Sequence, residues 1–143
     1  MNLRRKARET ALQALYKLDI AGASGEEDLE LEELAPGTAE RRYCETLVQG
    51  VRTRLASLDQ EIEKYSENWT ISRMSVVDRN ILRIAVYELL YSEVPYKVII
   101  DEAVELAKKF GTDESGPFIN GIIDRIRKAV VEDRSRQFNA KEP

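Results

Sequence analysis

The side chains with the clearest chemical use stand at the start of the chain. Arg4, Arg5, Lys6 and Arg8 lie close together, and Tyr16 follows two helical turns later, in a protein whose formal net charge is −4. Cations that bind phosphates, beside an aromatic ring that stacks on bases, are the combination by which proteins bind single-stranded RNA. Two plainer explanations stay open. Basic ends often only increase solubility, and a tyrosine can pack against a neighbouring helix while its hydroxyl stays in water.

Helical periodicity places these side chains on one surface. At about 100° per residue, Arg5, Gln13 and Tyr16 fall in one narrow sector of a helix over residues 4–20, opposite a stripe of alanine and leucine. The helix dipole disfavours cations in a first turn, so the cluster has a cost without an evident structural return. Nearby acids such as Glu9 keep the patch small, which predicts weak RNA binding in the absence of a partner.

The composition argues against an enzyme. The chain has no histidine, so neither a catalytic triad nor a histidine-ligated metal site can form. Cys44 has no imidazole to activate it and is expected to be a small buried hydrophobe. No glycine-rich phosphate-binding loop is present. We therefore predict no catalytic residues, no metal, no cofactor and no small-molecule substrate.

The chain also carries no sign of a membrane or secreted location. Its longest apolar runs, such as residues 98–100, are far too short to span a bilayer. Polar residues interrupt the stretch after the basic start, which argues against a signal peptide. A single cysteine cannot form an internal disulfide, as is usual in a reducing cytosol. We therefore expect a cytoplasmic protein with no membrane partner.

Hydrophobic periodicity predicts an all-α fold. The most apolar segment, residues 76–91, should form a central buried helix that begins after an N-cap at Ser75. On that helix Glu88 lies among apolar residues, and we expect it to accept hydrogen bonds from backbone donors near Val98. The remaining helices are expected at residues 4–20, from 38 or 39 onward, at 58–65, at 98–110 with Gly111 as its stop, and from Pro117 to about residue 134.

The chain fits a single helical domain over residues 1–134. Within it, residues 22–37 contain six acids between Glu26 and Glu33, and they are predicted to form a loosely packed loop. Residues 135–143 are predicted to form a flexible C-terminal tail. Neither a strand pattern nor an internal repeat interrupts the succession of helices.

Residues 82–126 carry the most specific pattern of the chain. The pieces LRIAVYEL, VPYKVIIDEAVELAKKFG and FINGIID, together with RRKARETALQALY near the start, resemble the NusB family of bacterial transcription antitermination factors. The resemblance implies a compact fold of about seven helices, in two lobes with a central hydrophobic helix. It also implies that the protein binds the boxA element of nascent ribosomal RNA together with NusE, a small-subunit ribosomal protein. That complex helps RNA polymerase read through terminators.

The same resemblance assigns roles to individual positions. The surface for NusE falls near the start of the central helix, on Asp78 with Arg79 and Arg83 beside it. Residues 115–117, with the sequence SGP, depart from the polar or cationic residues expected in that turn. The RNA-binding surface falls on the basic start, the outer face of the first helix and the turn before the last helix: Arg4, Arg5, Lys6, Arg8, Gln13, Tyr16, Glu114 and Phe118.

Two other functions compete with this one. Similar helical domains precede the catalytic domain of some ribosomal RNA cytosine methyltransferases, although this chain has neither a glycine-rich cofactor motif nor a nucleophilic cysteine motif. A helical adaptor that binds only proteins, and whose basic start is incidental, is the other alternative. Titration with boxA-like RNA, with and without NusE, would separate the adaptor from the antitermination factor.

Overall fold

The computed structural model describes residues 3–22 and 34–141, with side chains for residues 4–22 and 34–132. The described residues form six α-helices and one 3₁₀ helix, so the all-α prediction is confirmed with fewer α-helices than the resemblance implied. The elements are α1 (Leu3–Ala21), α2 (Ala39–Thr53), α3 (Leu55–Lys64), η1 (Ile71–Arg73), α4 (Val76–Tyr91), α5 (Tyr96–Phe110) and α6 (Ser115–Lys141).

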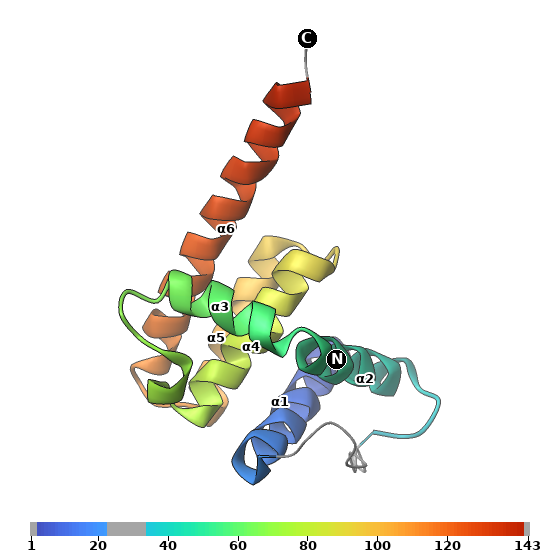
Figure 1. Ribbon diagram of the computed structural model, residues 1–143. Coiled ribbons are helices and arrows are strands. Elements are labelled where there is room, and N and C mark those ends of the chain that lie inside the picture. Colours follow the sequence, from blue (N-terminus) through green and yellow to red (C-terminus); the bar gives the residue numbers. More distant parts are fainter. Residues whose placement is uncertain (1–2, 23–33, 142–143) are drawn as a thin grey trace.

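Helix α4 is the centre of the molecule, as its composition predicted. It contacts each of the other five α-helices, and Ile81, Leu82 and Val86 on it are completely buried. Helix α1 packs mainly against α2, and α5 mainly against α6 (Figure 1). The two helix pairs are joined through α4, which confirms the expected two-lobed arrangement.

Local signals start the helices where the sequence predicted. The Oγ of Ser75 accepts a hydrogen bond from the backbone N–H of Asp78 at 3.1 Å, which is the geometry of an N-cap. Thr38 caps α2 in the same way by accepting from the backbone N–H of Arg41. Helix α2 accordingly begins at Ala39 and helix α4 at Val76, as predicted.

The last helix differs from the prediction at both ends. Because α6 begins at Ser115, Pro117 lies inside its first turn and is not its first residue. A proline is tolerated there because the first N–H groups of a helix have no intrahelical acceptor. Helix α6 also continues through Lys141 and projects beyond the other helices (Figure 1). The expected helix end near residue 134 is therefore wrong, and the backbone is helical over 135–141.

Gly111 ends α5 as predicted, but not through a left-handed backbone. Its φ of −100° is accessible to any residue. A Cβ at this position would lie 2.5 Å from the Oγ of Ser115 and 2.9 Å from the carbonyl oxygen of Ala107. Glycine is therefore required by the close approach of α5 and α6, which defines the turn at residues 111–114.

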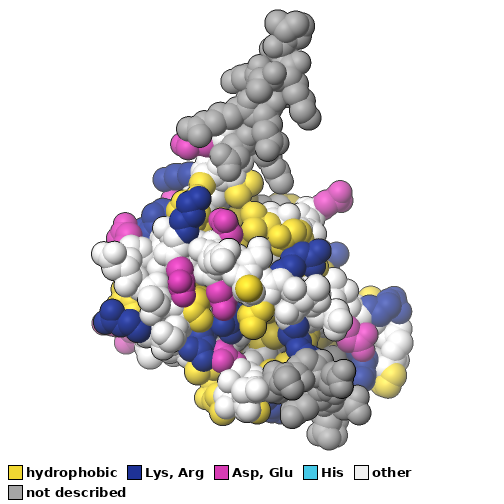
Figure 2. All heavy atoms as spheres, in the orientation of Figure 1, with side chains coloured by type: hydrophobic (Ala, Val, Ile, Leu, Met, Phe, Trp, Pro, Cys, Tyr) yellow, Lys and Arg dark blue, Asp and Glu magenta, His cyan; other side chains and the backbone are white. Residues whose placement is uncertain are grey.

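The remaining observations concern the surface, the membrane prediction and the acidic loop. Cationic, anionic and apolar side chains are interspersed on the face that Figure 2 shows. None of the helices in the described ranges is long and apolar enough to cross a membrane. Residues 23–33, with all six acids of the predicted loop, lie outside the described residues.

Candidate RNA- and partner-binding surfaces

The outer face of α1 presents the side chains that periodicity placed there. Lys6 and Gln13 are exposed, and Tyr16 keeps 39% of its surface accessible. Tyr16 therefore lies on the polar face and not in the core, as predicted. A partly exposed ring on a rigid helix can stack on a nucleic-acid base.

Arg4 contributes a positive charge near the N-terminal end of this face. Its guanidinium carbon lies 4.5 Å from the centroid of the Tyr43 ring on α2, and within the described ranges it has no carboxylate partner. A cation–π contact orients the guanidinium without neutralising it. The charge of Arg4 is therefore available to a phosphate.

Arg8 does not belong to this surface. It is 2% exposed, and it donates two hydrogen bonds of 2.8 Å to the carboxylate of Glu88 on α4. The expected surface position of Arg8 is wrong, because the residue shares the buried side of α1 with Ala11 and Leu15, three and seven positions further along the helix. That spacing was the signal in the sequence that could have placed it correctly.

Glu88 is a structural acceptor, as predicted, but its partners differ from those expected. It binds the side chains of Arg8 and Tyr43, whose hydroxyl donates a hydrogen bond to the carboxylate, and not backbone donors near Val98. Burial, together with the hydrogen bond and charge of Glu88, raises the pKa of Tyr43 to about 12. The phenol therefore remains a hydrogen-bond donor at neutral pH.

Arg5 connects α1 to α5. It donates two hydrogen bonds of 3.0 Å to the carboxylate of Glu102. Its side chain stays 47% exposed, whereas that of Glu102 is 7% exposed. The charge of Arg5 is therefore shared with an acid of α5, although one side of the guanidinium still faces solvent.

The end of α5 is joined to α1 by an ion pair. The Nζ of Lys109, at the end of α5, is 3.0 Å from the Oε2 of Glu9 on α1, and the turn at residues 111–114 follows immediately. Glu114 is exposed in this turn. The ion pair thus ties the end of α5, two residues before this turn, to α1.

Phe118 is mainly a packing residue. It is partly buried against the core, and its ring meets that of Trp69 edge to face, with centroids 5.9 Å apart at an angle of 72°. Trp69 itself is 45% exposed. Any contact between Phe118 and RNA would therefore involve the Trp69 side of the ring pair.

Arg79 and Arg83 are bound inside the protein and do not form an open surface beside Asp78. Arg79 donates hydrogen bonds of 2.7 and 2.6 Å to the carboxylate of Asp19. Arg83, which is 6% exposed, binds Asp59 through two hydrogen bonds of 2.8 and 2.9 Å and also reaches Asp19. These contacts attach the start of α4 to α1 and α3.

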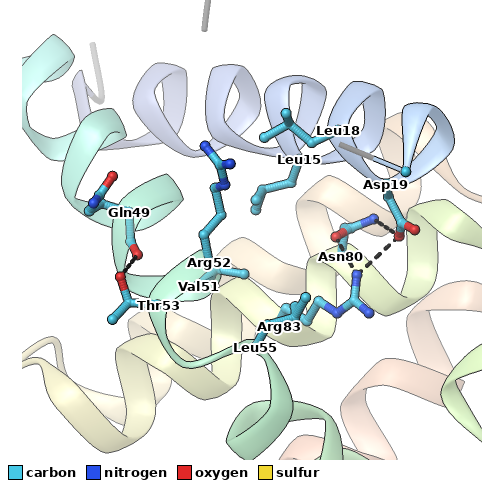
Figure 3. Close-up of a pocket in the computed structure, with 11 residues that line it drawn as sticks. Leu15, Leu18, Asp19, Gln49, Val51, Arg52, Thr53, Leu55, Asn80 and Arg83 are labelled. Carbon is cyan, nitrogen blue, oxygen red and sulfur yellow. Dashed lines mark hydrogen bonds and ion pairs between the residues drawn. The ribbon is translucent and has the colours of Figure 1, made fainter. Parts of the chain in front are cut away.

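The electrostatic state of Asp19 follows from this network. Burial alone would raise its pKa, but hydrogen bonds from Arg79 and Asn80 and the charge of Arg83 outweigh burial and hold the pKa below its usual value. Beside the network, a cavity of about 460 Å³ lies between α1, α2 and α4 (Figure 3). Arg52 extends from α2 toward α1 there, and its buried Nη2 has no hydrogen-bond partner in the described part of the chain.

Asp78 stands apart from the arginines next to it. Its backbone N–H binds Ser75, which places its carboxylate in the first turn of α4, where the helix dipole favours a negative charge. Its buried Oδ1 has no hydrogen-bond partner among the described residues. Asp78 thus lies in the first turn of α4, and one of its carboxylate oxygens accepts no hydrogen bond from the described residues.

Nothing in the described ranges resembles a catalytic or metal centre. No group of three or more metal-ligating side chains occurs among these residues. Cys44 is buried, as predicted, and burial together with the nearby charge of Glu45 raises the pKa of its thiol to about 11. The cysteine is therefore protonated at neutral pH and is a poor nucleophile.

Comparison with known proteins assigns this fold to a family of transcription antitermination proteins. Residues 5–128 match the NusB family, and the chain belongs to that family. It is 44% identical over 137 residues to the transcription antitermination protein NusB of Myxococcus xanthus, covering 91% of this chain and 98% of that protein. Its identity to the NusB of Desulfosudis oleivorans is 46% over 136 residues, covering 91% and 88%. The family is non-enzymatic, which confirms the prediction of no enzymatic activity.

Solved structures confirm the fold. NusB of T. maritima superposes with a TM-score of 0.75 at 43% identity, covering 87% of this chain and 90% of that one. A chain in the crystal structure of the antitermination factors NusB and NusE in complex with double-stranded RNA superposes with a TM-score of 0.77 at 30% identity, covering 90% and 98%.

Proposed function

We propose that the chain binds boxA RNA of nascent ribosomal RNA transcripts together with NusE, and that the complex helps RNA polymerase read through terminators in the cytoplasm. The observation that carries the proposal is the outer face of α1, where exposed Lys6, Gln13 and Tyr16 follow Arg4, a cation without a carboxylate partner among the described residues. The antitermination relatives and the similar chain in a complex with NusE and RNA support it.

In this proposal, some of the residues assigned to RNA lie along the strand, and others only hold the helices in position. Arg4, Arg5 and Lys6 bind phosphates, and Gln13 and Tyr16 contact bases. Glu114 borders the strand from the neighbouring turn. Arg8 and Phe118 act through position: Arg8 fixes α1 on α4, and Phe118 supports the start of α6.

The proposed surface for NusE is centred on Asp78. Its half-buried carboxylate lies in the first turn of α4, and a cationic group of NusE would pair with its charge. Arg79 and Arg83 hold the start of α4 in place through Asp19 and Asp59. They therefore shape this surface and are not its main contacts.

Titration with boxA-like RNA, in the presence and absence of NusE, tests the proposal. The double variant Arg4→Ala/Lys6→Ala should bind RNA more weakly, and the slope of log affinity against log salt should fall by about 0.7 for each phosphate contact removed. Lys97→Ala is a matched control, because Lys97 is an exposed cation at the start of α5. An unchanged salt slope in the double variant would favour the protein-binding adaptor. The methyltransferase alternative is not retained, since the family is non-enzymatic.

A further inference from the structure

A second cationic and aromatic surface lies where the end of α2 meets the end of α4. The guanidinium carbon of Arg54, which follows α2, is 4.3 Å from the centroid of the Tyr91 ring and 5.9 Å from that of Tyr87. The two rings are stacked, with centroids 5.7 Å apart and planes at 29°. Tyr91 is 45% exposed. The arrangement therefore offers a stacked, partly exposed ring next to a cation.

A shallow groove of about 700 Å³ runs along α2 to this stack. Gly50 forms part of its floor, because a Cβ at that position would lie 2.3 Å from the ring of Tyr87. Among the described residues, Glu45 is the one acid that lines the groove, and it is paired with Arg41 at 3.0 Å. Its other polar lining residues are Arg42, Thr46, Gln49, Thr53 and Arg54.

Within residues 4–22 and 34–132, no acid neutralises either of the two arginines of the groove. Arg42 donates a hydrogen bond of 2.8 Å to the carbonyl oxygen of Gly37, and Arg54 contacts the two tyrosine rings. In the chain as described, neither has a carboxylate partner, in contrast to Arg8 and Arg83. A guanidinium stacked on a ring keeps its full charge and can still direct N–H groups at a phosphate.

We propose that this surface, formed by Arg42, Arg54 and Tyr91, binds single-stranded RNA that continues from the strand on α1. The inference rests on the proposed function, because the first part of the strand must lie on α1. Arg4 lies over Tyr43, so the start of α1 lies beside the start of α2, where Arg42 begins the groove. The arginines bind phosphates along the groove, and the exposed ring of Tyr91 stacks on a base at its end.

Another arginine–tyrosine pair shows what distinguishes this surface and serves as the control. Arg127 lies 4.5 Å from the centroid of the Tyr96 ring, so its local geometry resembles that of Arg54 and Tyr91. There, however, the Tyr96 hydroxyl donates a hydrogen bond to the carboxylate of Asp124 at 3.2 Å. That acid is itself paired with Lys128 at 3.0 Å. Tyr96 and Arg127 belong to α5 and α6 and do not line the groove on α2, so the pair is not expected to bind the proposed strand.

The experiment compares two RNAs on the full chain with NusE present: one with the boxA element alone, and one extended by single-stranded pyrimidines at either end. One extension should raise the affinity. Tyr91→Ala should reduce affinity for that extended RNA about tenfold, as expected for one lost stacking contact, and leave the short RNA unaffected. Tyr91→Phe should keep the gain. Arg54→Ala should lower the salt slope for the extended RNA by about 0.7, and Arg127→Ala should change neither RNA.

The outcomes separate this inference from the proposed function. If the short RNA binds but neither extension adds affinity, the second surface is disproved and the α1 site stands. The second surface is also disproved if Tyr91→Ala and Arg127→Ala weaken the extended RNA equally, since the effect is then one of general charge or stability. If neither RNA binds, the proposed function and the inference fall together. Melting curves of all variants establish that each is folded.

Discussion

Arg8 and Glu88 form a buried ion pair between α1 and α4, in which both N–O distances are 2.8 Å and both side chains are 2% exposed. A guanidinium and a carboxylate that meet through two parallel hydrogen bonds have a fixed relative orientation. The pair therefore fixes the rotation of α1 on α4, and that rotation determines that Lys6 and Tyr16 face solvent. The most buried cation of the basic start thus positions the exposed ones.

Breaking this pair should destabilise the fold strongly. Arg8→Met leaves Glu88 buried without its cation, which typically costs about 3–5 kcal/mol. The double variant Arg8→Met/Glu88→Leu should recover part of the loss, because it removes both charges together. Chemical denaturation measures the free energy of unfolding. Lys108→Met is the control: its ion pair with Glu105 is exposed, so the change should stay below about 1 kcal/mol. An equally small effect for Arg8→Met would contradict the structural role.

Tyr16 should matter for RNA and not for folding. If its ring stacks on a base, Tyr16→Ala should weaken RNA binding by about 1–3 kcal/mol, whereas Tyr16→Phe should have little effect. The melting temperature should hardly change, since the ring is 39% exposed. Fluorescence titration and a melting curve on the same samples test both statements. A lower melting temperature with intact RNA affinity would show that the ring serves packing.

The partner surface should be separable from the RNA surface. Asp78→Lys reverses the charge at the proposed NusE contact and should weaken the heterodimer, while RNA binding by the protein alone stays largely unchanged. Arg79→Met tests the positioning role, because it should lower stability by releasing Asp19 and weaken NusE binding only as a consequence. Calorimetric titration with NusE measures both. If Asp78→Lys binds NusE normally but melts at a lower temperature, Asp78 only stabilises the start of α4 and does not contact NusE.

Stability should fall in acid partly through Asp19. Its pKa is lower in the folded protein than its usual value, so its ion pairs stabilise the fold at pH values above about 4. That contribution is lost as the pH falls through the folded-state pKa. Asp19→Asn should therefore be less stable than the wild type at neutral pH and should show a shallower loss of stability in acid. Urea unfolding at a series of pH values tests this, with the exposed Asp101→Asn as control. Parallel pH profiles for Asp19→Asn and the wild type would refute the assignment.

The sequence predicted the helices well because their signals are local. The apolar run of α4 and the cap at Ser75 depend on neighbours within a few positions. The orientation of Tyr16 also follows from the period of a single helix. These features required no knowledge of how the helices pack.

The charge pairing could not be predicted in the same way. Arg8 and Glu88 are far apart in the sequence, as are Arg79 and Asp19, and each pair forms only once α1 and α4 are packed. Glu102 shows the same effect: its carboxylate on α5 is buried against Arg5 of α1. Periodicity indicates which residues share a face, but not which face meets which helix. The assigned cations were therefore recognisable, while their division into exposed and structural ones was not.

Glu114 should limit RNA affinity. It is exposed in the turn between α5 and α6, which the resemblance assigns to the RNA surface, so we expect the proposed strand to pass near its carboxylate. A carboxylate repels phosphates and offers only acceptor atoms. Glu114→Gln keeps the shape, removes the charge and adds a donor, so we expect tighter RNA binding.

The salt dependence distinguishes this effect from a change in the fold. Repulsion between a carboxylate and phosphates is screened by ions, so the gain from Glu114→Gln should be largest at low salt and shrink as salt is added. Asp113→Asn is the matched control, because Asp113 is the neighbouring exposed acid of the same turn and is not assigned to RNA. If Glu114 instead points away from the strand, its replacement would leave RNA affinity unchanged at every salt concentration. Equal or weaker binding by Glu114→Gln at low salt, with an unchanged melting temperature, would exclude the residue from the RNA surface.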